Sequence, residues 1–160
     1  MNLGQFTELR LLVPQLFSEW RDGAISELSQ RLESAGRVEN ANAFASAVLD
    51  HESSGSAVFD QTAFPLARSE TVKELSFALG LSSPGVRWGA GRTPIVRAVI
   101  LFAVPPSEER TYLSLVLTFA RFSNDEKSFS DLQCCAQPGQ MLAVLNQVRC
   151  VPTGPGSPIA

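Results

Sequence analysis

The segment "IVRAVILFAV" (95–104) decides the fold class of this chain. It is rich in β-branched residues and almost continuously apolar, which predicts a β-strand. A strand with so few polar side chains is expected to be covered by helices on both faces of its sheet. Pro105 and Pro106 follow directly and end the strand. The sequence therefore predicts an α/β domain built around this segment.

Helices are expected on the C-terminal side of this strand. Residues 107–125 predict a helix with Ser107 as its N-cap and two glutamates in its first turn, where they suit the helix dipole. Its apolar residues are so dense that much of it must be buried. Two further helices are expected at 127–136 and 138–148, the second beginning at Pro138.

Short strands and turns are expected on the N-terminal side. The segment "ELSFALGL" (74–81) partly alternates and predicts a strand. The segment "SSPGVRWGAGRTP" (82–94) is rich in turn residues and predicts a loop with a short extended piece at 86–88. Pro65 lacks a backbone donor and belongs at a strand end or edge. Two short apolar segments are also expected to be strands: 56–59 and 62–67.

Two amphipathic helices are expected before these strands. The first spans 22–36, with Asp22 as a plausible N-cap and Gly36 at its end. The second spans 39–55, with Asn40 as its cap and Gly55 at its end.

The element order implies one domain, residues 1–150, followed by a disordered tail at 151–160 that is rich in proline and glycine. We expect a mostly parallel or mixed central sheet of about four to five strands, flanked by helices on both faces. No internal repeat and no long linker divides the chain.

Composition and charge narrow the function classes. The net charge is -3, so a basic surface for nucleic acid is not expected. No apolar run approaches the roughly 20 residues of a membrane span, so no membrane insertion is expected. The N-terminus lacks the features of a signal peptide, and we therefore expect a cytoplasmic protein.

The three cysteines are Cys134, Cys135 and Cys150. Adjacent residues lie about 3.8 Å apart at Cα, closer than the ~4.4–6.8 Å usual for a disulfide. Their spacing, with a single histidine in the chain, does not support a zinc site. We expect reduced, structural cysteines, no metal and no cofactor.

Four segments together carry a resemblance to a known family: "VLDHESSGS" (48–56), "AFPLAR" (63–68), "PIVRAVILFAVPPSE" (94–108) and "YLSLVLTFARFSND" (112–125). In this order and spacing, the chain from about residue 8 to 148 resembles the enzyme IIA domain of the bacterial phosphoenolpyruvate phosphotransferase system. The type is fructose–mannitol, including its nitrogen-regulatory branch. The second segment is similar to that family's Ala-Ile-Pro-His-Ala-Arg.

The resemblance implies a phosphocarrier in which a histidine accepts phosphate from a histidine-carrier protein and passes it on. It also implies a second histidine nearby and an arginine that stabilises the phosphoryl oxygens. The matching positions of this chain hold Leu66, Tyr112 and His51 respectively. Leucine has no lone pair, so we expect no phosphotransfer at this position and no catalytic residue.

A glycine-rich run of the family is also changed. The chain has "GSAVFDQT" (55–62) where the resemblance implies Gly-Ser-Thr-Gly-Ile-Gly-x-Gly, and it is one residue shorter. Asp60 would repel an incoming phosphate if it faced the site.

Several residues keep alternative interpretations. Leu66 either packs in the core or forms an exposed docking patch that mimics the unphosphorylated carrier. His51 either replaces the missing acceptor, with Arg68 as the cation opposite, or is a solvated or hydrogen-bonded histidine, or binds a ligand. Tyr112 is either a core residue with a wet tip or a ligand contact.

Three further residues with alternative interpretations lie in the expected loop at 82–94. Arg87, Trp88 and Arg92 either form an anion-binding or partner surface, or the tryptophan is a half-buried anchor of the loop.

Three functions follow. The leading one is a degenerate, regulatory enzyme IIA-like module that is not an enzyme and binds a protein partner. By analogy the partner is a histidine-carrier protein, a sensor kinase or a transporter, and a homodimer stays open. The second is an active phosphocarrier that uses His51. The third is a small-molecule binding module with an apolar pocket. The candidate binding residues are Phe64, Leu66, Arg68, His51 and Tyr112.

Overall fold

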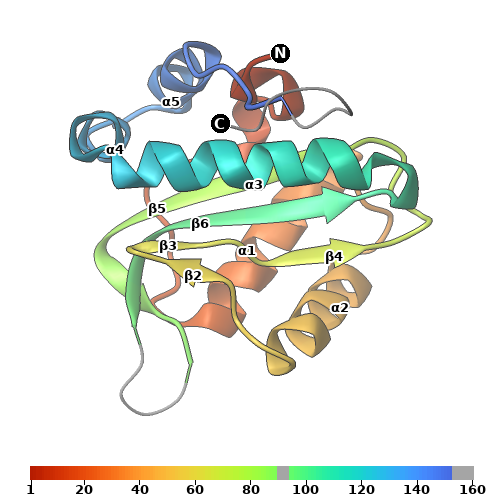
Figure 1. The fold of residues 1–160 in the computed structure, drawn as a ribbon. Coiled ribbons are helices and arrows are strands. Elements are labelled where there is room, and N and C mark those ends of the chain that lie inside the picture. The colour runs from red at the N-terminus through yellow and green to blue at the C-terminus, as the bar shows by residue number, and fades with distance from the viewer. Residues whose placement is uncertain (90–93, 153–160) are drawn as a thin grey trace.

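A computed structural model describes residues 1–89 and 94–152 of the chain. Within these ranges the chain forms a six-stranded mixed sheet with helices on both faces (Figure 1). The predicted α/β class, the mixed sheet and the two helical layers are therefore confirmed, with more strands than the expected four to five. The expected tail lies almost entirely outside the described residues.

The centre of the sheet is the antiparallel pair β5 (Ser76–Arg87) and β6 (Ile95–Val104). The strand order is β1-β5-β6-β3-β2, and β4 also pairs with β6. Alternate residues of β6 enter two separate cores: Leu101 packs on one face and Phe102 on the other. A strand that is buried on both faces explains the nearly continuous apolar run in the sequence.

The remaining strands are short. β1 (Leu12–Val13) lies parallel to β5, and β2 (Val58–Phe59) forms an antiparallel hairpin with β3 (Thr62–Ala63). β4 (Leu66–Arg68) runs parallel to β6. Pro65 lies between β3 and β4, as expected for a residue without a backbone donor, and its carbonyl accepts from the Phe102 N–H at 2.9 Å.

One face of the sheet is covered by α1 (Arg21–Ser34) and α2 (Ala41–Ser53). Asn40 caps α2 as predicted, because its side-chain oxygen accepts from the Ala43 N–H at 2.9 Å. Gly36 follows α1 with a φ of 73°, a conformation that suits glycine at a helix end. Asp22 is not the N-cap of α1: Trp20 holds that position and Asp22 lies in the first turn.

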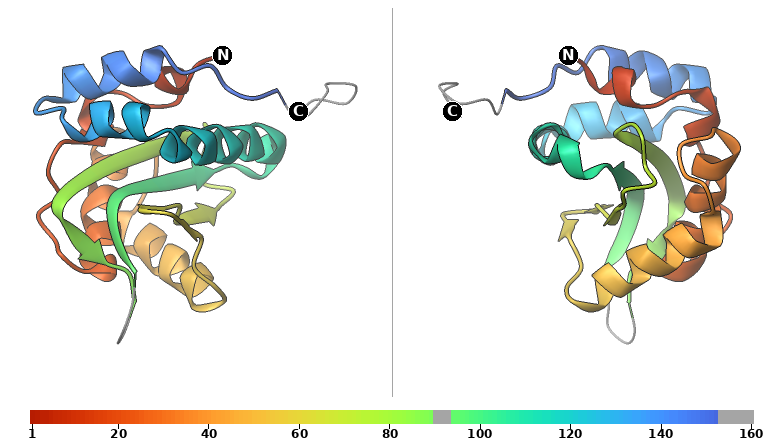
Figure 2. Two further views of the ribbon diagram at one scale, coloured as in Figure 1. Left: turned by 60° about the vertical axis from the view of Figure 1, so that its left-hand side comes forward. Right: turned by 90° about the vertical axis from the view of Figure 1, so that its right-hand side faces the viewer.

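The opposite face is covered by α3 (Glu109–Asn124), α4 (Glu126–Gln133) and α5 (Pro138–Asn146) (Figure 2). The 3-10 helices η1 (Leu3–Phe6) and η2 (Leu9–Leu11) lie near the N-terminus. A third, η3 (Pro106–Glu108), contains Ser107, so the predicted serine cap of α3 is wrong and Glu108 takes its place.

The predicted loop at 82–94 is wrong over residues 82–85, whereas the extended piece predicted at 86–88 is confirmed for 86–87. β5 continues to Arg87 through a bulge between Leu81 and Val86. Gly85 lies in this bulge with a φ of 94°, and a Cβ there would lie 2.1 Å from the Cγ2 of Ile95. Ser-Ser-Pro-Gly is ordinary turn composition, but here it bends a strand instead of ending it.

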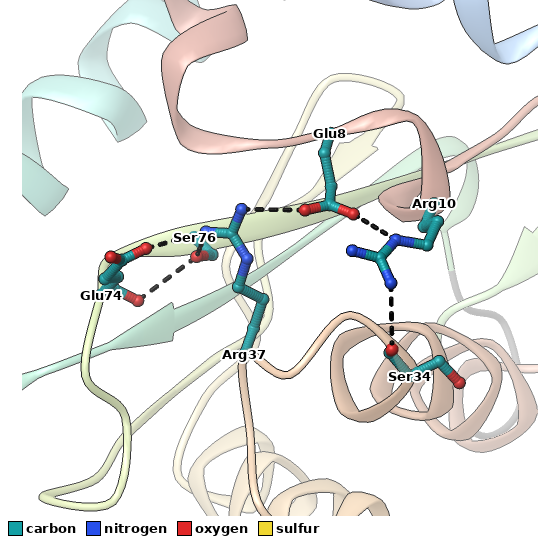
Figure 3. A network of polar contacts seen from close by, with 6 residues as sticks. All are labelled: Glu8, Arg10, Ser34, Arg37, Glu74 and Ser76. Carbon is teal, nitrogen blue, oxygen red and sulfur yellow. Dashed lines mark hydrogen bonds and ion pairs between the residues drawn. The ribbon is translucent and has the colours of Figure 1, made fainter.

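A polar network joins the α1–α2 connection to β5 (Figure 3). The Arg37 guanidinium donates to Ser76 at 2.7 Å and to Glu8 at 3.1 Å. Hydrogen bonds from Arg10 and Arg37 lower the pKa of the Glu8 carboxyl. This network holds the N-terminal segment against the start of β5.

Candidate functional site

Leu66 is the first residue of β4 and lies opposite Phe102 of β6. Its side chain is 5% exposed and belongs to the core on the α3 face, together with Phe64 and Tyr112. The interpretation that Leu66 packs in the core is therefore confirmed. The alternative of an exposed leucine docking patch is wrong.

Two residues beyond Leu66, Arg68 forms a two-pronged ion pair. Its Nε and Nη2 donate to the two carboxylate oxygens of Glu109 at 2.7 and 2.6 Å. Its guanidinium carbon lies 5.4 Å from the ring centroid of Tyr112. The hydrogen bonds from Arg68 lower the pKa of Glu109, and the same bonds raise the pKa of Arg68. The cation nearest position 66 along β4 is thus already compensated by a carboxylate.

Tyr112 is a core residue at the start of α3. It is 7% exposed and packs edge-on against Phe102, with ring centroids 5.3 Å apart. Burial raises the pKa of its hydroxyl above the ordinary value, so the phenol is neutral near neutral pH. This agrees with the core interpretation made from the sequence.

His51 is exposed near the end of α2, on the sheet face opposite α3. Its neighbour Glu52 is buried and accepts from the Trp88 indole N–H at 3.2 Å and from the Ser56 hydroxyl. Arg68 points to the α3 face, where it binds Glu109. Among the described residues, Arg68 is therefore bound to Glu109, and no hydrogen bond or ion pair joins it to His51.

Trp88 lies at the end of β5 and is only 3% exposed. This agrees with the interpretation of the tryptophan as an anchor, although it is buried and not half-buried as expected. Arg87 turns away from it and lies over the ring of Trp20, 5.1 Å from its centroid. The prediction that Arg87 and Trp88 share one binding surface is therefore wrong. Arg92 lies outside the described residues.

The hairpin between β2 and β3 lies where the resemblance implies a glycine-rich run. Asp60 occupies its turn with a φ of 56°, a left-handed conformation that aspartate tolerates better than most residues. The Asp60 side chain is exposed. A turn of this kind can thus form without the glycines that the resemblance implied.

In the described parts of the chain, no group of three or more histidine, cysteine or acidic side chains could hold a metal ion. The three cysteines are free, and burial raises the pKa of the Cys135 and Cys150 thiols. None of the helices in these parts has the length and apolarity needed to cross a membrane.

The fold and the sequence together define the class of protein. Residues 6–148 match the family described as "Phosphoenolpyruvate-dependent sugar phosphotransferase system, EIIA 2". The chain belongs to this family, which confirms the resemblance found in the sequence.

A curated relative is the "PTS system 2-O-alpha-mannosyl-D-glycerate-specific EIIABC component" of Escherichia coli (strain K12). It is 29% identical over 149 residues, which cover 91% of this chain and 23% of the relative. The chain thus spans about a quarter of that protein's length.

Solved structures share the fold. The nitrogen regulatory protein IIA-Ntr from Neisseria meningitidis superposes with a TM-score of 0.79 at 17% identity, covering 89% of this chain and 97% of that one. IIA mannitol from Escherichia coli gives 0.73 at 20% identity, covering 86% and 97%. The same IIA in complex with phosphorylated IIB mannitol gives 0.73 at 20%, covering 87% and 97%.

Glu109 is the site residue that the sequence analysis missed. It lies 41 positions from Arg68 and was assigned only to the helix dipole.

Proposed function

We propose that this chain is an EIIA-type domain that accepts no phosphate at position 66 and acts in the cytoplasm by binding a protein partner. The observation that carries the proposal is the aliphatic, 5% exposed side chain of Leu66 where the resemblance implies a phosphorylated histidine. A phosphoryl group needs a nucleophile with a lone pair, and leucine offers none.

The surroundings of Leu66 support the same conclusion. Phosphoryl transfer depends on positive charge placed near the phosphoryl oxygens. Arg68 is bound through both prongs to Glu109, so its charge is compensated. A substitution to histidine at position 66 alone would therefore supply a nucleophile without a free cation beside it.

An apolar surface for a partner is available on α3. Leu113 and Leu117 lie one turn apart on this helix and are 48% and 41% exposed. They follow the turn that carries Glu109. Exposed apolar side chains grouped on one surface often mark protein interaction sites.

A IIB-type domain is the first partner to test, because the neighbouring IIA mannitol forms a complex with phosphorylated IIB mannitol. The histidine-carrier protein is the second. A sensor kinase or a transporter would be tested as a partner only after the IIB-type domain and the histidine-carrier protein.

The experiment is a calorimetric titration of the chain with a purified IIB-type domain and, separately, with a histidine-carrier protein. The double variant Leu113→Glu, Leu117→Glu should bind about tenfold or more weakly, since it removes two central apolar contacts. Leu9→Glu is the matched control, because Leu9 is 51% exposed but lies in η2. Absence of binding to both partners, or equal binding by the double variant, would contradict the proposal.

The two other functions have less support. A phosphocarrier that uses His51 would need Arg68 as its cation, and Arg68 is bound to Glu109. Three candidate residues for an apolar ligand pocket belong to one buried core cluster: Phe64, Leu66 and Tyr112, which are 4%, 5% and 7% exposed. This packing does not favour an apolar ligand pocket among them.

A further inference from the structure

We propose that the chain binds a small organic anion, a carboxylate or a phosphate ester, in a polar cavity beside Arg97. The cavity measures about 290 Å³ and lies between the segment after β1, the bulge of β5 and the start of β6. Its size is just below the range of roughly 300–1,000 Å³ found for ligand pockets, so it suits a small molecule.

The charge of the cavity favours an anion. Arg97 is the single ionised residue of its lining, and no carboxylate lines it, although acidic residues outnumber basic ones in the chain. Among the described residues, the one partner of the Arg97 guanidinium is the Ser83 carbonyl. An arginine carries five N–H donors, so most of this fork is available to an oxyanion.

Neutral donors surround the arginine. Gln61 comes from the β2–β3 hairpin and Gln133 from the end of α4. In the part of the chain that the structure describes, both glutamines are exposed and neither side-chain amide has a hydrogen-bond partner. Each amide can donate to an oxygen of a ligand, which adds orientation to the charge of Arg97.

The walls of the cavity are held in place before any ligand arrives. Gln15 accepts from the Ser83 N–H at 3.3 Å and donates to the Leu16 carbonyl at 3.1 Å. Ser82 accepts from the Gly85 N–H at 3.0 Å. Because this wall is already ordered, a ligand does not have to order it on binding, which removes one entropy cost.

The cavity is separate from position 66. Leu66 lies opposite Phe102, five residues along β6 from Arg97, which corresponds to roughly 17 Å. The proposal therefore does not depend on whether the chain carries phosphate, and the two can fail independently.

The experiment is a titration followed by ¹⁵N–¹H NMR of the Arg97 Nε–H and of the Gln61 and Gln133 amides. The probes are succinate, glycerol 3-phosphate and, as a neutral control, glycerol, at constant ionic strength. We expect saturable shifts of these signals with at least one anion, with a Kd of about 1 mM, and no shifts with glycerol. The two anion arms distinguish the carboxylate from the phosphate ester.

Arg97→Gln should weaken binding about tenfold or more, because it removes the charged hydrogen bonds. Arg87→Gln is the matched control: it removes one arginine charge from the same strand pair and should leave the Kd unchanged. Gln133→Ala, at an exposed helix end, should weaken binding without disturbing the fold. The proposal would be overturned by the absence of saturable shifts, or by an unchanged Kd in Arg97→Gln with a native-like spectrum. It would also be overturned if Arg87→Gln weakened binding as much as Arg97→Gln.

Discussion

At the scale of single residues, Arg68 and Glu109 form a local ion pair two residues beyond Leu66. Both side chains are a little over 40% exposed, so solvent screens the pair and its contribution to stability is small. The geometry is nevertheless two-pronged, which orders the arginine over Tyr112.

This pair makes a pH-dependent prediction. The pKa of Glu109 is lowered in the folded state, so its stabilisation is present above the unfolded value of about 4.3 and is lost as the pH falls through the folded pKa. Arg68→Gln should return the Glu109 pKa towards its ordinary range and cost about 0.2–1 kcal/mol near pH 7. Carbon-detected NMR titration of the carboxyl groups measures the pKa.

The control for this titration is Arg21→Gln, because Arg21 pairs with Asp22 and not with Glu109. An unchanged Glu109 pKa in Arg68→Gln would show that the ion pair does not form in solution.

Sequence reasoning located the changed residues of this region but not their contacts. Leu66, Tyr112 and Arg68 were found because they stand in short motifs. The sequence favoured a packed Leu66 but left an exposed position open, since a leucine beside a proline is compatible with both. Glu109 was missed because nothing local links it to a residue 41 positions away.

At the scale of elements, Glu52 and Trp88 tie α2 to the end of β5. Glu52 is only 5% exposed, and the indole N–H of Trp88 is one of its two hydrogen-bond donors. A buried carboxylate that loses a donor carries a desolvation cost that is no longer compensated.

Trp88→Phe should therefore lower the free energy of unfolding by about 1–3 kcal/mol. The matched variant is Trp20→Phe, because Trp20 is 56% exposed and loses mainly its contact with Arg87, worth about 0.5–1 kcal/mol. Urea unfolding of both variants measures the difference. Equal costs for the two tryptophans would contradict the role of the Trp88–Glu52 bond.

The elements that the sequence predicted well carry strong local signals. The apolar run of β6 and the cap of α2 are examples. β1 was missed because a strand of two residues has no periodicity to detect. Residues 86–87 of β5 were predicted as extended, but residues 82–85 were predicted as a loop because the bulge uses the residues of a turn. Only pairing with β6 shows that the strand continues.

At the scale of the whole molecule, the domain has the fold of the EIIA family, and Leu66, where the resemblance implies a histidine, lies in the core. Two apolar cores, one on each side of the sheet, stabilise this fold without any contribution from a phosphorylated residue. A fold can persist when its original site is lost, because packing and chemistry depend on different residues.

The most direct test of the account is phosphotransfer to the purified chain. The chain is incubated with phosphoenolpyruvate, enzyme I and a histidine-carrier protein, with a competent EIIA domain as control in the same tube, and intact mass is measured without acid. We predict phosphate on the control and no added phosphate on this chain. An acid-labile gain of one phosphate would contradict the central claim, and its loss in His51→Ala would identify His51 as the acceptor.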